Sequence, residues 1–108
     1  MAGEIPEGLA IEQIWVAECE YAPDAAEKRP AVRAEHLARI GRLRAEGIIV
    51  EAGAFADMSG SLLLLRVPTE EAALEILKAD VYWRAGLWTS FRIRSLGHVV
   101  RIDEVPGL

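Results

Sequence analysis

A histidine stands in the middle of an apolar helical face near the start of the chain. At about 100° per residue, Val32, His36, Ile40 and Leu43 fall within roughly 80° of helical arc. We expect Arg39 to point away from this face. An imidazole on that face is directed toward a core or a pocket, where its ring nitrogens need hydrogen-bond partners. Histidine is also the side chain best suited to proton transfer near neutral pH. His36 is therefore the first candidate for chemistry.

Asp80 is the expected partner of His36. It follows Leu77 by three residues, so it extends the inward face of a second helical segment. A carboxylate that accepts the Nδ1 proton would fix the imidazole tautomer and leave Nε2 as a general base, a role that accelerates reactions by ~10²–10⁴. Two simpler interpretations stay open. His36 could be a core histidine bonded to a backbone carbonyl, and Asp80 could be the N-cap of a short helix that starts at Val81.

Aromatic and basic residues close to this pair could complete a binding site. Arg33, beside Arg29 in sequence, lies at the margin of the buried helical face and could hold an anionic substrate through charge-assisted hydrogen bonds. Aromatic side chains near a polar pair can line a pocket for a planar substrate. The aromatic candidates are Tyr82, Trp83, Trp88 and Phe91, with Phe55 as a further substrate-binding residue. Core or interface packing of the aromatics and a solvated arginine are the alternatives.

Composition narrows the class of protein. The chain has 108 residues, 52% hydrophobic and 27% charged, which is typical of one soluble globular domain. The net charge of −5 offers no basic field for nucleic acid. The longest apolar run, Leu62 to Leu65, is far shorter than the ~20 residues that span a bilayer. We therefore expect neither nucleic acid nor a membrane as partner.

The small numbers of cysteines and histidines argue against an internal disulfide and a metal site. The single cysteine, Cys19, cannot form an internal disulfide, and with only two histidines a metal site is not expected. The second histidine, His98, lies in a C-terminal segment without a comparable pattern. The chain carries no Gly-rich phosphate loop and no nucleophile elbow, and its first residues do not form a secretory signal. These features predict a cytoplasmic protein that uses no cofactor.

Hydrophobic periods and turn residues predict the order of the elements. A first helix is expected from Pro30 to a stop at Gly47, preceded by a short turn at Asp24 with the spacing of a capping box. A second helix follows the cap residue Thr69. Gly53 is isolated inside a strand, so it marks a bulge or a close backbone approach, which could open space beside His36. The expected strands are 11–19, 48–55, 61–67 and 87–96, and a short helix is expected at 81–86.

The order strand, helix, strand, strand, helix, strand is that of the ferredoxin-like α+β fold, with two helices on one face of an antiparallel sheet. Residues 1–10 form a predicted flexible arm, 11–98 the domain and 99–108 a C-terminal tail. The strands at 48–50 and 62–65 are apolar on both faces, and nothing in the chain is left to cover the second face. We therefore predict a homodimer packed sheet to sheet, an assembly of the dimeric α+β barrel type.

Several short motifs resemble the YCII-related family. Arg33-Ala34-Glu35-His36-Leu37 is similar to the family's arginine before an "HL" helix, Ala52-Gly53 to its "aG" strand, and Asp80-Val81-Tyr82 with Ala85-Gly86-Leu87 to its "DPY…aGl" turn. The resemblance covers about residues 11–98. Val81 and Ala54 stand where the family has, or often has, proline. The resemblance implies a ferredoxin-like fold, a dimer, and His36 and Asp80 as the counterparts of the family's active-site pair.

Three functions are compatible with these residues. In the first, the protein is a cofactor-independent enzyme in which His36 and Asp80 act as general acid and base in elimination, isomerisation or hydrolysis of a small carbonyl or phenolic substrate. In the second, the same pocket binds a small-molecule ligand without turnover. In the third, the chain is a structural dimer with a vestigial pocket. The distance between His36 and Asp80 is the first observation that separates them.

Overall fold

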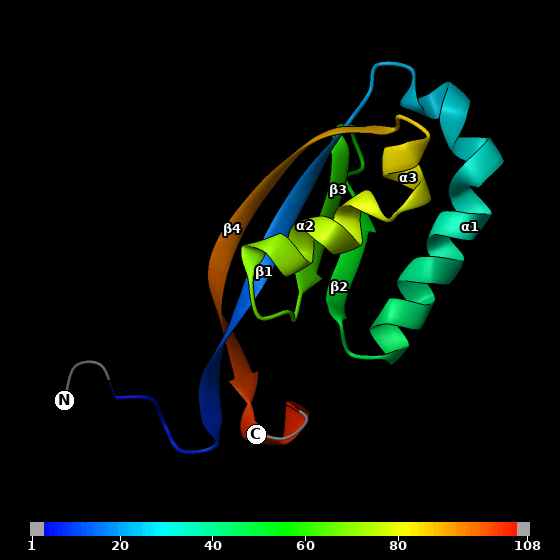
Figure 1. The fold of residues 1–108 in the computed structure, drawn as a ribbon. Helices are drawn as coiled ribbons and strands as arrows, with labels where there is room; N and C mark the ends of the chain where they lie inside the picture. Colours follow the sequence, from blue (N-terminus) through cyan, green and yellow to red (C-terminus); the bar gives the residue numbers. More distant parts are fainter. Residues whose placement is uncertain (1–3, 106–108) are drawn as a thin grey trace.

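A computed structural model describes residues 4–105 as one antiparallel sheet with helices packed on one of its faces (Figure 1). The strands are β1 (Leu9–Tyr21), β2 (Ile49–Ala54), β3 (Gly60–Leu65) and β4 (Trp88–Arg101). The helices are α1 (Ala25–Ala45), α2 (Glu70–Lys78) and α3 (Val81–Arg84), followed after β4 by the 3-10 turn η1 (Ile102–Glu104). The strand order β2-β3-β1-β4, antiparallel throughout, confirms the predicted ferredoxin-like α+β class.

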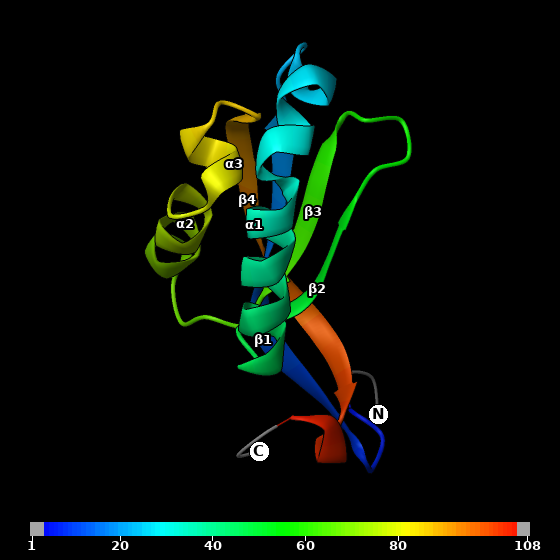
Figure 2. The same cartoon turned by 90° about the vertical axis from the view of Figure 1, so that its right-hand side faces the viewer.

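The hydrophobic core lies between the sheet and the helices. Along β3, Leu63 and Leu65 are buried toward the helices, whereas Leu62 and Leu64 are half-buried on the opposite face. In Figure 2, α1 lies in front of the sheet, with α2 and α3 beside it. The leucine block of β3 therefore does not lie in a fully buried strand, because only every second side chain meets the helices.

Helix α1 begins five residues before Pro30 and continues through it. Asp24 holds the N-cap position without a side-chain capping bond, because its carboxylate pairs instead with Lys28 at 3.1 Å. The predicted capping box is therefore wrong, and the short turn is the first part of one long helix. The predicted stop at Gly47 is confirmed. Gly47 has a φ of 78°, and the bonds Gly47 N–H to Arg44 O and Ile48 N–H to Leu43 O form a Schellman motif.

The ladder between β1 and β4 is longer at both ends than predicted. It pairs Leu9 with Arg101, so residues 9–10 and 99–101 are strand and not part of an arm or a tail. His98 belongs to this ladder, and its Nδ1 lies 2.9 Å from Glu12 Oε1. The error arose because these ends lack apolar alternation: the strands run beyond the helices there, and both faces carry mixed residues (Figure 1). Residues 1–3 of the predicted arm and 106–108 of the predicted tail lie outside the described part of the chain.

Two glycines in the β2–β3 hairpin differ in the space around them. A Cβ at Gly60 would collide with the backbone carbonyl of Cys19 on β1, whereas a Cβ at Gly53 would have no heavy atom within 4 Å. The register shift in this hairpin lies between Ile49 and Glu51. Gly53 therefore does not mark a bulge, but it does open space, as the sequence led us to expect.

The Gly60→Ala variant should be destabilised, since its methyl group can be accommodated only if β1 and β3 move apart. We expect a loss of about 1–3 kcal/mol in the free energy of unfolding, measured by urea denaturation. Gly53→Ala is the matched control and should unfold at the same urea concentration as the wild type or slightly above it. Equal stability of the two variants would contradict the close approach at Gly60.

Candidate active site

The Asp80 carboxylate is fully buried at the junction of α2 and α3. It accepts hydrogen bonds from His36 Nδ1 at 2.7 Å and from the backbone N–H of Tyr82 at 2.9 Å, both on Oδ1. Asp80 is thus both the N-cap of α3 and the partner of His36, so the two interpretations of this residue hold together. The predicted pair is formed within ordinary hydrogen-bond distance.

Arg39 is a third donor to the same carboxylate. Its Nη1 lies 3.0 Å from Asp80 Oδ2, and its Nη2 donates to the Ile76 carbonyl at 2.9 Å. The expectation that Arg39 points away from this face was wrong, because seven residues at about 100° each place Arg39 only about 20° from Val32 on the helical wheel, directly beside the buried face. The spacing of three residues from His36, which places both side chains on neighbouring positions of α1, was the available signal.

These donors keep Asp80 ionised. Burial raises the pKa of the carboxyl group, but the hydrogen bonds from His36, Tyr82 N–H and Arg39 outweigh that effect and hold the pKa below its usual value. A carboxylate can only accept, so the bridging proton belongs to His36 Nδ1. Nε2 is then the unprotonated nitrogen of the neutral ring, the form in which imidazole acts as a base.

Two aromatic rings fix the orientation of the imidazole. The Tyr82 ring is stacked on it, with centroids 3.6 Å apart and an angle of 9° between the planes. The Trp88 ring meets it edge-on, at 5.5 Å and 90°. Because His36 itself is only 7% exposed, it cannot change its rotamer without displacing these rings. The histidine is therefore held in place by packing as well as by Asp80.

A cavity of about 340 Å³ adjoins the histidine, between α1 and the ends of β2 and β3. Its size lies within the range of small-molecule sites, ~300–1,000 Å³. Arg29 and Arg33 lie on its α1 side, and the Nε of Arg29 is buried without a hydrogen-bond acceptor among residues 4–105. The other residues in its wall are Tyr21, His36, Leu37, Ile40, Ala52, Gly53, Ala54, Ser61, Leu63 and Tyr82.

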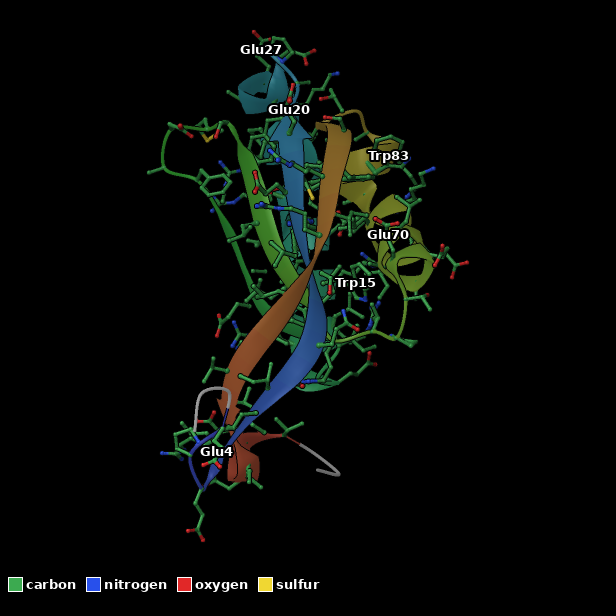
Figure 3. The ribbon with its side chains drawn as sticks, turned by 90° about the vertical axis from the view of Figure 1, so that its left-hand side faces the viewer. Glu4, Trp15, Glu20, Glu27, Glu70 and Trp83 are labelled. Carbon is green, nitrogen blue, oxygen red and sulfur yellow. The ribbon has the colours of Figure 1, made fainter. Side chains whose placement is uncertain are left out.

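Four of the five predicted aromatic residues, Trp83, Phe91, Phe55 and Trp88, do not line the cavity. Trp83 packs on Phe91 at 4.8 Å, on the α3 and β4 side of the molecule (Figure 3). Phe55 is exposed in the β2–β3 turn and does not line the cavity. Trp88 is buried behind His36 and supports the site without forming its wall. Of the predicted substrate-binding residues, the cavity brings together Arg33 and Tyr82.

Two residues in the cavity wall, Tyr21 and Ser61, are absent from the predicted set. Tyr21 is the last residue of β1, and the predicted strand ended two residues earlier at Cys19. Continuing its alternation would have placed Tyr21 on the inner face with Ala17 and Cys19. Ser61 likewise shares the alternation of Leu63 and Leu65, and a polar residue in that series was the signal.

Residues 4–105 contain neither a membrane-spanning helix nor a cluster of metal-ligating side chains. No helix in this part of the chain is long and apolar enough to cross a membrane. No group of three or more histidine, cysteine, aspartate or glutamate side chains gathers there in a way that could hold a metal ion.

The comparisons with known proteins agree with this fold. The fold defines a ferredoxin-like α+β protein, and the family model for the YCII-related domain matches residues 14–96. The chain therefore belongs to the YCII-related family. A similar solved structure is 5-chloro-2-hydroxyhydroquinone dehydrochlorinase of Burkholderia phenoliruptrix AC1100 in complex with 2,5-dihydroxybenzoquinone. The likeness has a TM-score of 0.68 and 20% identity, and covers 79% of this chain and 94% of that one. Among curated proteins no match was found.

The Asp80→Asn variant should lose stability in a pH-dependent way. A pKa that is lower in the folded than in the unfolded chain contributes stability above the unfolded value, ~3.9, and that stability is lost as the pH falls through the folded value. At pH 7 we expect a cost of about 3–5 kcal/mol, because a buried charge network loses its anion. The gap between wild type and variant, measured by urea denaturation from pH 7 to pH 3, should narrow below pH 4. A constant gap would contradict the lowered pKa.

Proposed function

We propose that this protein is a small-molecule enzyme in which His36 and Asp80 form the proton-transfer dyad. The observation that carries the proposal is the 2.7 Å bond between His36 Nδ1 and the buried Asp80 carboxylate, at a histidine that lines a cavity of ligand size. A core histidine would need only one backbone carbonyl and no adjoining space. That the chemistry needs no cofactor stays a prediction of the sequence.

In the proposed reaction, His36 Nε2 removes a proton from the substrate. The imidazolium that forms is stabilised by the Asp80 carboxylate, which stays ionised because Tyr82 N–H and Arg39 also bind it. The electron pair moves onto a substrate oxygen to give an enolate or phenolate, which then expels a leaving group or is reprotonated at another atom by His36. The same dyad thereby serves elimination and isomerisation.

The substrate class follows from the strength of the base and from the charge of the cavity. Imidazole is a weak base, so the proton must be acidified by a neighbouring carbonyl or phenol. Arg29 and Arg33 favour an anionic molecule, and the cavity accommodates a single substituted ring. The dehydrochlorinase of similar fold is named for a chlorinated hydroxyhydroquinone, which makes hydroxylated quinones and hydroquinones the first compounds to test.

The test is turnover of such compounds by purified protein. We expect wild type to release chloride from 5-chloro-2-hydroxyhydroquinone, or to exchange an acidic ring proton of a hydroxyquinone with D₂O, followed by ion chromatography and NMR. His36→Gln should lower kcat by ~10²–10⁴. The matched control is His98→Gln, since His98 has a comparable bond to Glu12 at 2.9 Å but lies on the far face of the sheet, away from the cavity.

Two outcomes would contradict this function. If the compounds bind, and His36→Gln changes only their Kd while wild type turns over none of them, the protein is a binding module. If nothing binds and His36→Leu is neutral or stabilising, the pocket is vestigial, because a buried polar group has then been removed without loss.

We further propose that the protein acts as a homodimer through the sheet face that no described helix covers. Leu62, Leu64 and Val16 are half-buried on that face, the side of the sheet turned toward the viewer in Figure 3. A second copy fits because the apolar strip is flanked by pairs of opposite charge, Glu18 with Arg94 and Glu12 with Arg66. Leu96, one of the large exposed apolar side chains among residues 4–105, lies on the same face, because it pairs with Ile14 in the ladder.

The dimer is tested by sedimentation velocity at micromolar concentration. Wild type should sediment as a dimer, and Leu64→Arg should sediment as a monomer with unchanged circular dichroism, because a cation is then buried in an apolar interface. Leu37→Arg, at an exposed leucine of α1 on the helical face, is the control and should remain dimeric. A monomeric wild type would contradict the proposal.

A further inference from the structure

A chain of hydrogen bonds ends at the wall of the cavity beside His36. Trp88 Nε1 donates to Ser61 Oγ at 3.2 Å, and Ser61 Oγ donates to Tyr21 Oη at 3.0 Å. Because the indole N–H can only donate, Ser61 Oγ accepts that bond, and its own hydrogen is donated to Tyr21 Oη. The three groups carry three hydrogens, and the two bonds use two of them. With Ser61 as the donor, the hydrogen that is left over is on the Tyr21 hydroxyl.

The free hydroxyl hydrogen of Tyr21 is available only to a molecule in the cavity. Tyr21 is 7% exposed and Ser61 is 4% exposed, and both line the cavity that His36 lines. Among the hydrogen bonds between residues 4–105, none has Tyr21 Oη as donor. A buried donor needs an acceptor, and at the wall of a cavity a molecule bound there can supply it.

Tyr21 lies at the end of β1, on the same face as Ala17 and Cys19, where the regular ladder stops. The register between β1 and β4 shifts between Glu20 and Tyr21. The backbone beyond the shift is fixed by bonds from Tyr21 N–H to Ser59 O at 2.9 Å and from Ala22 N–H to Leu87 O at 2.7 Å. The main-chain bonds thus fix the backbone of Tyr21, and the bond from Ser61 fixes its hydroxyl group.

The aromatic cluster fixes the position of Tyr21 relative to His36. Tyr21 meets the Tyr82 ring edge-on at 6.4 Å, and Tyr82 is in turn stacked on His36 and meets Trp88 edge-on at 5.7 Å. Trp88 also links His36 to Tyr21. Its ring contacts the His36 ring, and its indole N–H begins the hydrogen-bond chain to the Tyr21 hydroxyl. A base and a hydroxyl donor are thereby held rigidly on one cavity.

We propose that Tyr21 is a catalytic residue whose hydroxyl binds the substrate oxygen that becomes negative when His36 removes a proton. The inference rests on the proposed function of the dyad. As the C–H or O–H bond breaks, its proton goes to His36 Nε2 and its electron pair forms the enolate or phenolate. The Tyr21 O–H donates a hydrogen bond to that oxygen and keeps its own proton. Ser61 and Trp88 are positioning residues, which act through the Tyr21 hydroxyl.

This arrangement selects for substrates that carry an oxygen acceptor at a fixed distance from the acidic proton. Arg29 and Arg33 attract an anion from their side of the cavity, but long cationic side chains do not define where a single oxygen lies. A buried hydroxyl that is held by Ser61 does define the position of one substrate oxygen. Tyr21 is thus expected to distinguish a carbonyl or phenol from a ring of the same size without oxygen.

The experiment compares Tyr21→Phe, Ser61→Ala and the double variant with wild type, in turnover and in binding. Tyr21→Phe removes one hydroxyl group and should lower kcat by about 10²-fold, as loss of one donor to a developing oxyanion does. Ser61→Ala should lower kcat less, since the hydroxyl remains but is no longer held. If Ser61 acts through Tyr21, the double variant should equal Tyr21→Phe, a non-additive result that two independent packing defects would not give.

The control is Thr89→Val, which removes a hydroxyl bonded to Glu20 O next to the same register shift but outside the cavity. This variant should keep wild-type kcat.

Binding is measured separately with 2,5-dihydroxybenzoquinone, whose visible absorption should shift on binding to wild type and shift less with Tyr21→Phe. If His36→Gln abolishes turnover while Tyr21→Phe keeps wild-type kcat and spectrum, the Tyr21 proposal is overturned and the dyad stands. If no compound is turned over but the smaller shift is seen, the dyad fails and Tyr21 stands as a ligand donor.

Discussion

The buried carboxylate of Asp80 is the constraint on which the other features of the site depend. Removing an ion of this kind from water costs several kcal/mol, and the cost is offset only where each oxygen meets strong donors. Here the donors come from two separate parts of the chain, with His36 and Arg39 on α1 and the Tyr82 N–H at the start of α3. The carboxylate therefore joins the two helical segments that cover the sheet, and it orients the imidazole by the same bonds.

The order of the elements around Asp80 explains why this one residue can both join the helical segments and orient the imidazole. α2 ends at Lys78, and the bond from Asp80 N–H to Leu77 O closes its last turn while the Asp80 side chain begins α3. Tyr82 is the second residue of α3, and its ring lies flat on the histidine. The stability of the junction and the geometry of the dyad thus depend on the same few atoms, so a substitution there affects both.

The sequence was sufficient for the parts of the fold and the site that follow a simple period. The 3.6-residue spacing identified the inward face that carries His36, and Gly47 marked the end of α1, because a positive φ favours glycine there. Arg39 and Tyr21 escaped prediction although their spacing carried a signal: Arg39 lies about 20° from Val32 on the helical wheel, and Tyr21 continues the alternation of Ala17 and Cys19. That each of them meets its partner, Asp80 or Ser61, depends on how separate segments pack, which a period within one segment does not specify. Phe55 and Trp83 were placed at the site by their proximity in sequence or type, which does not determine the face on which a ring lies.

The second histidine of the chain shows what a histidine–carboxylate pair requires to become a site. His98 and Glu12 lie 2.9 Å apart, and Arg66 also binds the carboxylate, so the three residue types of the His36 network recur on the opposite face of the sheet. There the pair lies on the ladder between β1 and β4, and neither residue lines the cavity. Both places therefore hold a histidine bonded to a carboxylate that an arginine also binds, at similar distances of 2.7 Å and 2.9 Å. What distinguishes His36 is the enclosed space beside its ring, the aromatic rings that prevent it from turning, and the Tyr21 hydroxyl donor on the same cavity wall.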